Sequence, residues 1–237
     1  MAFSEPLVVV EHLAKAYGIG EVQVHALRDA SLQISAGEFV VLLGPSGSGK
    51  TTLLNMIGGL DSPTGGRVRV RGVNIAEYNE NQLTAYRRQT VGFIFQFFNL
   101  IPTLTALENV ELVAELVGRR EQALARLEQV GLGNRAHHFP SELSGGEQQR
   151  VAIARALAKE PDVILADEPT GNLDYETSLV VLRALRDVNI LQNKAVMVVT
   201  HNNAIAQMAD TIVRMRSGVV VEQRRNAQPL QPEALQW

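Results

Sequence analysis

The sequence contains no cysteine. This absence excludes disulfide bonds, thiol catalysis and sites in which cysteine holds zinc or an iron–sulfur cluster. Histidine does not take its place, because the histidines follow no spacing typical of metal ligands. They are His12, His25, His137, His138 and His201.

Long apolar segments are also missing. The longest runs, such as residues 39–43, fall far short of the roughly 18 residues that a membrane-spanning helix needs. The N-terminus has no basic region, and Glu11 interrupts the apolar run at residues 7–10, so we predict no signal peptide. The sequence therefore predicts a soluble, cytosolic protein.

Charge of one sign is not in excess. The chain has 22 Lys and Arg residues against 25 Asp and Glu residues, for a net charge of −3. Because binding to a polyanion needs a basic surface, we do not expect nucleic acid as a partner. The 237 residues, 46% hydrophobic and 20% charged, are typical of a globular protein with a substantial core.

Three apolar runs predict buried parallel strands, at residues 39–43, 163–166 and 195–200. Short strands alternate with longer stretches of helical periodicity, which predicts an α/β fold with a mainly parallel sheet and helices on its faces. Because ligands gather at the carboxyl ends of the strands in such sheets, the three runs point to one site.

Other segments depart from this pattern. Residues 67–71 alternate arginine and valine, which predicts a half-exposed antiparallel strand. Residues 104–159 have helical periodicity, notably at 106–117, 121–130 and 151–158, and predict a helical lobe inserted into the α/β core. Residues 226–237 are rich in glutamine and proline, and we expect a flexible tail there.

A phosphate-binding motif follows the first of these strands. Residues 44–51 fit the pattern G-x-x-x-x-G-K-[ST], and a helix is predicted to begin at Lys50. The glycines let backbone N–H groups surround a phosphate, Lys50 adds a positive charge, and the Thr51 hydroxyl can bind Mg²⁺. The predicted nucleotide-binding residues here are Gly44, Pro45, Ser46, Gly47, Ser48, Gly49, Lys50, Thr51 and Thr52. A glycine-rich turn that binds nothing is the alternative, and the flanking strand and helix disfavour it.

Two acidic residues end the second apolar strand. Asp167 is suited to holding Mg²⁺, directly or through water, and Glu168 to polarising a water molecule for in-line attack. Taken alone, this pair would equally fit a solvated acidic turn. The phosphate-binding motif makes the catalytic interpretation the stronger one.

Residues 143–150, with the sequence LSGGEQQR, begin a further predicted helix. Ser144 and Glu147 have the spacing of a capping box. Capping alone does not explain Gly145 and Gly146, because each glycine costs a helix about 1 kcal/mol. The close approach of another backbone or of a phosphate would explain both glycines.

These motifs occur in the same order as in the ABC-type ATPases, and the chain resembles that family over nearly its whole length. The matching segments are the phosphate loop (44–51), the Q-loop (Gln96), the signature motif (143–150), the acidic strand (163–168), the D-loop (171–174) and the switch histidine (His201). Residues 95–102, 140–143 and 171–174 most resemble the macrolide-exporter and lipoprotein-release branch. One departure is Asn202, where many relatives carry aspartate.

The resemblance implies a P-loop NTPase core of the RecA-like type, with an antiparallel β subdomain and an inserted α-helical subdomain. It implies a single ABC ATPase domain over residues 1–237, with the ATP-binding core at 1–96 and 160–225 and the helical signature subdomain at 97–159. It also implies the role of each site residue. The catalytic residues would be Lys50, Gln96, Glu168 and His201, and Mg²⁺ would be held by Thr51, Gln96 and Asp167. Tyr17 would stack on the adenine. Asp167 and the catalytic residues Gln96 and His201 would also contact the nucleotide, and the γ-phosphate of ATP on a partner chain would be bound by Ser144, Gly145 and Gly146.

The resemblance further implies ATP and Mg²⁺ as cofactors and a head-to-tail homodimer around two ATP molecules, with Asp174 contacting the partner. A separate membrane permease would receive the work through a cytoplasmic helix docked beside Gln96, and would hold the chain at the inner face of the cell membrane. A non-transport ABC ATPase that acts on DNA or ribosomes is the alternative. It is disfavoured because the sequence has no inserted coiled coil or zinc module and only one ATPase module.

Overall fold

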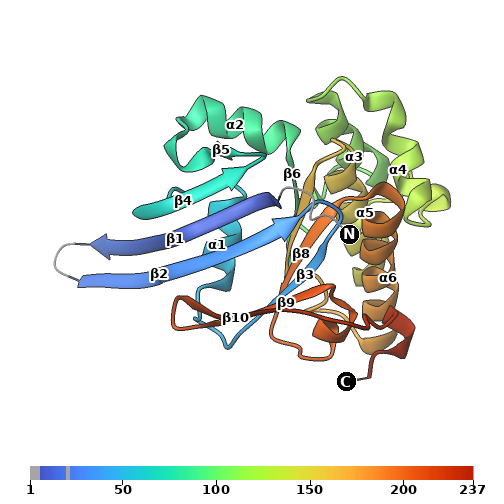
Figure 1. Cartoon of the computed structure of the whole chain (residues 1–237). Helices are drawn as coiled ribbons and strands as arrows, with labels where there is room; N and C mark the ends of the chain where they lie inside the picture. Colours follow the sequence, from blue (N-terminus) through green and yellow to red (C-terminus); the bar gives the residue numbers. More distant parts are fainter. Residues whose placement is uncertain (1–5, 20–21, 237) are drawn as a thin grey trace.

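The computed structural model of the chain describes residues 6–19 and 22–236. Within these ranges the strands form one sheet in the order β5-β4-β1-β2-β10-β9-β3-β8-β7-β6. Figure 1 shows its two parts, a group of long antiparallel strands on the left and a twisted, mainly parallel group in the centre. The two parts meet where Val219 of β10 pairs with Asp29 of β2.

The antiparallel part consists of β1 (Pro6–Ile19), β2 (Val22–Ser35), β4 (Gly65–Val70) and β5 (Val73–Asn74). Strand β4 pairs antiparallel with β1, which confirms the strand predicted from the alternation of arginine and valine. Val68 and Val70 are buried, while Arg67 is exposed to solvent. Alternate side chains of β4 therefore point to the core and to solvent, as the period of a strand requires.

The parallel part consists of β3 (Phe39–Leu43), β6 (Val91–Ile94), β7 (Val163–Asp167), β8 (Ala195–Thr200) and β9 (Thr211–Arg216), with β10 (Val219–Arg225) antiparallel to β9. The three strands predicted from apolar runs are confirmed as β3, β7 and β8. Phe39 and Val41 of β3 belong to one core cluster, and Val40 and Leu42 belong to another. Both faces of β3 are therefore buried, and every residue of the strand must be apolar. A strand with one exposed face would instead alternate apolar and polar residues.

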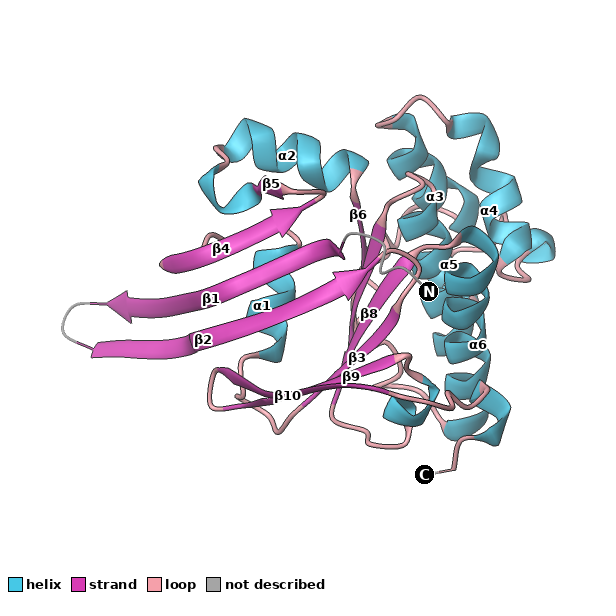
Figure 2. Ribbon diagram, in the orientation of Figure 1, coloured by secondary structure: helices cyan, strands magenta, loops and turns pink. Residues whose placement is uncertain are grey.

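The helices are α1 (Lys50–Ile57), α2 (Glu80–Gln89), α3 (Ala106–Glu115), α4 (Ala123–Gln129), α5 (Gly145–Leu157) and α6 (Tyr175–Gln192). Short 3-10 turns lie at Ile75–Glu77, Arg120–Gln122, Gly133–Arg135, Pro140–Glu142, Ile205–Met208 and Pro232–Ala234. Figure 2 shows α3 to α6 together on one side of the parallel strands, with α1 beside the antiparallel strands on the other. The predicted helices are present, and α1 begins at Lys50 as expected.

The C-terminal segment is packed against the domain, which corrects the expectation of a flexible tail. Leu235 is fully buried, and its carbonyl oxygen accepts a 2.7 Å hydrogen bond from the Tyr175 hydroxyl at the start of α6. Glu233 pairs with Arg183 of the same helix. Figure 1 shows this red segment beside the lower end of α6. Trp237, the last residue of the expected tail, lies outside the described residues.

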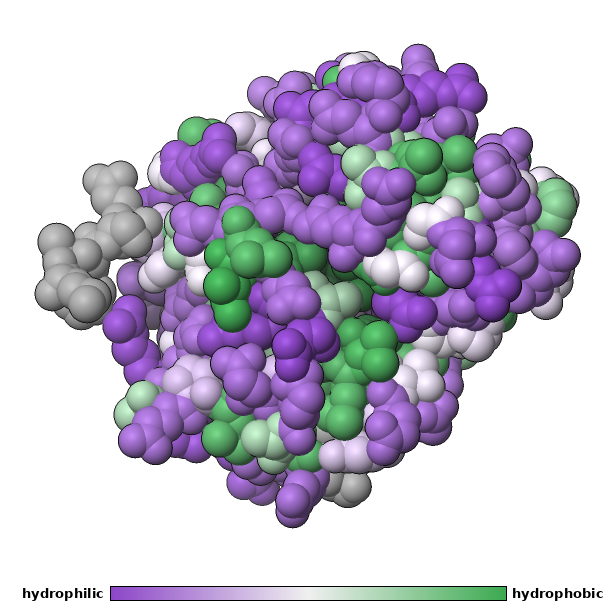
Figure 3. Space-filling model, turned by 90° about the vertical axis from the view of Figure 1, so that its right-hand side faces the viewer, coloured by the Kyte–Doolittle hydropathy of each residue, from purple (hydrophilic) through white to green (hydrophobic). Residues whose placement is uncertain are grey.

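The surface that carries α6 is mixed in character. Figure 3 views the right-hand side of Figure 1 and shows separate apolar groups among mostly polar side chains. On α6 itself, Val180, Ile190 and Leu191 are exposed. Within residues 6–19 and 22–236, no helix is both long enough and apolar enough to cross a membrane.

Candidate functional site

The loop between β3 and α1 is tightly packed on one side and open on the other. Gly47 and Gly49 have φ angles of 75° and 99°, a conformation that favours glycine. A Cβ atom at Gly49 would lie 2.5 Å from the Ala26 carbonyl oxygen, whereas one at Gly47 would meet open space. The glycines therefore let the loop pack against β2 while its other side stays free for a ligand.

The first turn of α1 is suited to binding an anion. Among the described residues it has neither a side-chain cap nor an acidic residue, so its positive dipole end is not offset by the chain itself. Lys50 is 8% exposed and donates hydrogen bonds to the carbonyl oxygens of Gly44 and Pro45, at 2.7 and 3.0 Å. The ammonium thus lies inside the loop, where a phosphate is a stronger partner than two carbonyls. These residues fit a nucleotide phosphate.

Thr51 and Asp167 meet where α1 begins and β7 ends. The Thr51 hydroxyl donates a 3.2 Å hydrogen bond to Oδ1 of Asp167. Burial raises the pKa of Asp167 and the charge of Glu168 adds to the increase, while Thr51 and Lys50 act in the opposite direction. A divalent cation would offset the cost of this buried negative charge, and hydroxyl and carboxylate oxygens are the ligands that Mg²⁺ prefers. This pair fits Mg²⁺.

Glu168 is fixed by three contacts at the end of β7. Its backbone is left-handed, with φ at 46°, and its amide donates a 2.9 Å hydrogen bond to the Val199 carbonyl of β8. Its Oε1 lies 2.9 Å from Nδ1 of His201, and its Oε2 accepts a 3.1 Å hydrogen bond from the Thr200 hydroxyl. Such a backbone conformation is costly outside glycine, and it is typical of functional sites.

Gln96 is held by the segment that precedes α6. Its Nε2 donates to Oδ1 of Asn172, and Nδ2 of Asn172 donates to the Gln96 carbonyl, both at 3.2 Å. A Cβ atom at Gly171 would lie 2.9 Å from Nε2 of Gln96, so a larger residue there would displace the Gln96 side chain. The Q-loop and the D-loop named above are therefore in direct contact within one chain.

The signature segment caps α5 and packs on α6. Ser144 and Glu147 form the predicted capping box, in which the Ser144 amide donates to Glu147 at 2.9 Å and the Glu147 amide donates to Oγ of Ser144 at 3.3 Å. A Cβ atom at Gly146 would overlap the methyl group of Thr177, whereas one at Gly145 would lie 3.2 Å from Leu173. Side-chain packing on α6 thus explains Gly146, and leaves Gly145 as the less constrained of the two.

Tyr17 lies near the end of β1 with 43% of its surface exposed. Its hydroxyl donates a 2.8 Å hydrogen bond to Oδ2 of Asp61. Burial, together with Asp61, raises the pKa of the phenol, and the nearby Thr52 of α1 acts in the opposite direction. An exposed aromatic ring beside the phosphate loop can stack on a base.

The structure brings most of the predicted residues to one edge of the parallel strands. Lys50, Thr51, Asp167, Glu168 and His201 form a connected group there. Gly145 and Gly146 lie instead against Leu173 and Thr177 near the start of α6, and Gln96 bonds to Asn172.

Two residues that hold predicted site residues had no role predicted from the sequence. Thr200 donates to Glu168, and its signal is a polar residue that closes an otherwise apolar strand. Asn172 holds Gln96 from within the predicted D-loop.

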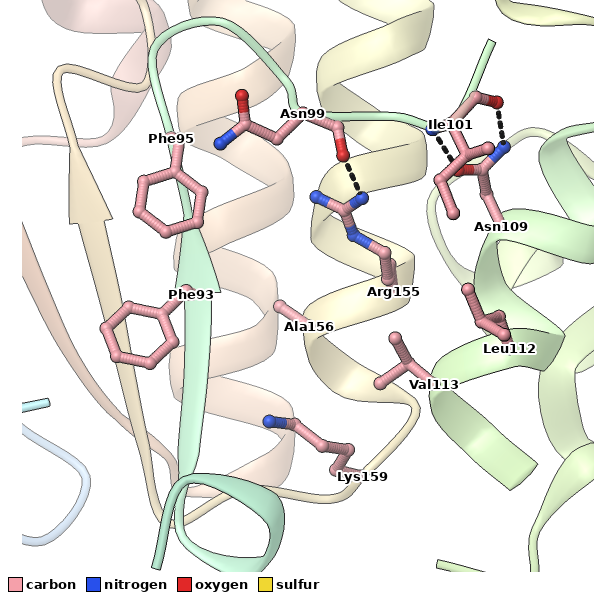
Figure 4. Close-up of a pocket in the computed structure, with 10 residues that line it drawn as sticks. All are labelled: Phe93, Phe95, Asn99, Ile101, Asn109, Leu112, Val113, Arg155, Ala156 and Lys159. Atoms are coloured by element: carbon pink, nitrogen blue, oxygen red, sulfur yellow. Dashed lines mark hydrogen bonds between the residues drawn. The ribbon is translucent and has the colours of Figure 1, made fainter. Parts of the chain in front are cut away.

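A cavity of about 300 Å³ opens behind the Q-loop, between β6, α3 and α5. Figure 4 shows the rings of Phe93 and Phe95 on one wall and Leu112 of α3 on the other, with Arg155 and Lys159 between them. The two phenylalanine rings are stacked, with their centres 5.7 Å apart. Arg155 donates to the carbonyl of Phe98 at 2.8 Å and also to that of Asn99, which fixes the Q-loop on α5.

The sequence matches the family model described as ABC transporter over residues 27–171. An uncharacterized ABC transporter ATP-binding protein of Thermotoga maritima is 49% identical over 209 residues, which cover 86% of this chain and 89% of that protein. The macrolide export ATP-binding/permease protein MacB of Hyphomonas neptunium is 44% identical over 98% of this chain. The chain spans 37% of that longer protein.

Solved structures show the same fold. The ATP-binding cassette MJ0796, solved as a dimer in a post-hydrolysis state with ADP and Pi, has a TM-score of 0.84 and 44% identity, over 92% of this chain and 98% of that one. CbiO1 of Clostridium perfringens, part of the transporter complex cbiONQ, has a TM-score of 0.83 and 26% identity, over 97% of this chain and 90% of that one. The family match covers more than half of the sequence, and the chain belongs to the ABC transporter family.

Proposed function

We propose that two copies of this chain bind and hydrolyse two ATP molecules between them and drive a separate membrane permease. The observation that carries the proposal is the connected group at the phosphate loop, in which Lys50, the Thr51–Asp167 pair and the Glu168–His201 pair converge. The similarity to a cassette solved as a dimer with ADP and Pi supports the same chemistry.

Each residue has a distinct task in this proposal. The loop amides and Lys50 bind the phosphates, and Glu168 accepts a hydrogen bond from the attacking water and orients it in line. His201, directly after β8, holds the Glu168 carboxylate and would contact the γ-phosphate. Thr51, Asp167 and Gln96 would hold Mg²⁺, which when bound neutralises charge on the phosphates.

The second half of each site comes from the partner chain. The Ser144 hydroxyl and the amides of Gly145 and Gly146 lie at the start of α5, so they present hydrogen-bond donors to a γ-phosphate. Asp174 caps α6 by accepting from the Thr177 amide at 2.9 Å, which fixes the D-loop for contact with the partner. ATP would thus close the dimer, and hydrolysis would reopen it.

The permease docks at the cavity behind the Q-loop. Leu112, on the wall opposite the two phenylalanine rings, is 51% exposed, and Phe97, two residues after Phe95 in the chain, is 73% exposed. An amphipathic cytoplasmic helix of the permease fits such an apolar groove. Because Arg155 carries Phe98 and Asn99 on α5, a force on this groove would reach Gln96. The complex would hold the chain at the inner face of the membrane.

The work done by the complex is export, lipoprotein release or transmission of force to a partner. Relatives that fuse the ATPase to its membrane part carry the name of macrolide export, and this chain spans 37% of the relative from Hyphomonas. The relative from Thermotoga, by contrast, is named only as an ABC transporter ATP-binding protein, and this chain covers 89% of it.

ATP turnover by the purified chain tests the chemistry. Wild-type protein should release phosphate from ATP in the presence of Mg²⁺, and Lys50→Ala should weaken nucleotide binding because it removes the ammonium from the loop. Lys194→Ala, on the loop before β8, is the matched control and should bind like the wild type. Unchanged ATP affinity of Lys50→Ala would contradict the phosphate-binding role of the loop.

Affinity purification from solubilised membranes tests the transport assignment. Tagged Glu168→Gln with ATP should retain an integral membrane permease, identified by mass spectrometry. Tagged Lys50→Ala is the control for binding that does not depend on nucleotide. Recovery of only ribosomes, DNA or other non-membrane partners would leave the ATPase chemistry in place and overturn the transport role.

A further inference from the structure

Three side chains near the phosphate loop form a compact cluster, and two of them, Lys15 and Asp61, have no role in the chemistry proposed above. Lys15 and Tyr17 come from β1, and Asp61 follows the C-terminus of α1. The Asp61 carboxylate accepts hydrogen bonds from Nζ of Lys15 at 2.7 Å and from the Tyr17 hydroxyl at 2.8 Å. It also accepts from the Ser62 amide at 2.7 Å. Each oxygen of Asp61 is therefore engaged by at least one donor.

Lys15 also covers one face of the aromatic ring. Its Nζ lies 4.8 Å from the centre of the Tyr17 ring and donates a second hydrogen bond, of 2.7 Å, to the Ser62 carbonyl. The Lys15 side chain is only 11% exposed, so it is fixed rather than free in solvent. A cation over one face leaves the opposite face of the ring for another flat group.

The cluster compensates for an irregular strand. The pairing of β1 with β2 shifts register on both sides of Lys15. Register shifts leave the backbone of a strand less well determined by its neighbour. The hydrogen bonds of Asp61 connect this part of β1 to the end of α1, the helix that follows the phosphate loop. They therefore fix the position of the Tyr17 ring relative to the phosphate loop.

We propose that Asp61 is a positioning residue for the base of the nucleotide. It anchors the phenol of Tyr17 and, through Lys15, covers one ring face, so that a purine stacks on the other face at low entropic cost. This inference rests on the proposed function, because it assumes that the phosphate loop binds ATP. Lys15 neutralises the charge of Asp61, so the carboxylate does not repel the phosphates.

The test compares ATP with inorganic tripolyphosphate, which has the phosphates and no base. Calorimetric Kd values for both are measured on the wild type, Asp61→Asn and Tyr17→Leu, with unfolding temperatures as the folding control. Asp61→Asn should weaken ATP binding about threefold to tenfold, the effect of losing one or two hydrogen bonds, and leave tripolyphosphate binding unchanged. In the Tyr17→Leu background, Asp61→Asn should have no further effect on ATP.

Asp29→Asn is the matched control, because Asp29 is another paired carboxylate of the antiparallel strands, 3.0 Å from His12. It should change neither affinity. Equal weakening of ATP and tripolyphosphate by Asp61→Asn, or an undiminished effect in the Tyr17→Leu background, would overturn the positioning role in favour of a general structural one. If the wild type binds neither ligand, the proposed function fails instead.

Discussion

Nδ1 of His201 lies 2.9 Å from Oε1 of Glu168, and this contact joins the ends of the neighbouring strands β8 and β7. The second oxygen of the same carboxylate is held by Thr200. The carboxylate is therefore oriented by side chains of the protein itself, and its side chain is 18% exposed against 69% for His201. In the proposed reaction, a water that reaches Glu168 meets a base whose direction is already set.

The first prediction concerns this carboxylate. Glu168→Gln preserves the shape of the side chain and its contacts with Thr200, but an amide is a far weaker base. We expect ATP binding to persist, turnover to fall by a factor of about 100 or more, and a dimer to accumulate with ATP. Phosphate release and sedimentation velocity measure the two effects. Glu128→Gln on the exposed side of α4 is the control, and wild-type turnover by Glu168→Gln would remove Glu168 from the mechanism.

The second prediction separates capping from dimer formation. Ser144 caps α5 together with Glu147, and Thr105 caps α3 together with Glu108 through the same set of contacts. Each alanine substitution should therefore lower the free energy of unfolding by about 1 kcal/mol. Only Ser144→Ala should also raise the ATP concentration needed for dimer formation, because only Ser144 is proposed to contact the partner's ATP.

Chemical denaturation gives the first quantity, and sedimentation in a Glu168→Gln background gives the second. Thr105→Ala thus serves as a control with the same local loss of hydrogen bonds. A similar shift of the dimer transition in both variants would show that Ser144 acts only through the stability of α5.

Local signals predicted much of the fold and most of the candidate site. The apolar run of β3, the helix start at Lys50 and the capping box of Ser144 depend on neighbouring residues in the sequence, so the sequence reveals them. Helix α6 was not anticipated, because exposed apolar residues such as Ile190 and Leu191 blur its amphipathic pattern.

Contacts between distant segments could not be predicted in the same way. The need for glycine at position 146 comes from Thr177, and the hydrogen bonds of Asp61 come from Lys15 and Tyr17 on β1. The C-terminal segment is polar in composition, yet Leu235 is buried because Tyr175 and Arg183 hold its neighbourhood on α6. The composition of a segment gives only its mean polarity, whereas the burial of a single leucine side chain can hold the segment against the domain.

The third prediction tests this packing. Leu235→Ala should lower the free energy of unfolding by about 2 kcal/mol, because it removes a fully buried leucine side chain. Leu230→Ala, at a site that is 36% exposed, should have a much smaller effect. Urea denaturation of both variants measures the difference. Equal stability of Leu235→Ala and the wild type would mean that the segment adds nothing to the folded state in solution.

The fourth prediction concerns Lys159, at the base of the cavity behind the Q-loop. Its Nζ donates a 2.7 Å hydrogen bond to the Arg87 carbonyl. Burial, followed by the charges of Arg155 and Arg87, lowers the pKa of Lys159 from 10.5 to about 8. Between these two values the unfolded chain binds more protons than the folded chain, so this lysine makes stability rise with pH across that window.

The change in stability is measured against a variant without the titrating group. From about pH 7 to about pH 9.5, the wild type should gain about 1 to 2 kcal/mol in free energy of unfolding relative to Lys159→Met. Burial also raises the pKa of Tyr86. This shift has the opposite effect on the pH dependence, because stability falls with rising pH once the unfolded phenol loses its proton. Because Tyr86 is present in both proteins, its contribution cancels in the difference. A difference that stays constant over this range would show that Lys159 keeps an ordinary pKa and that the cavity is open to water around its ammonium.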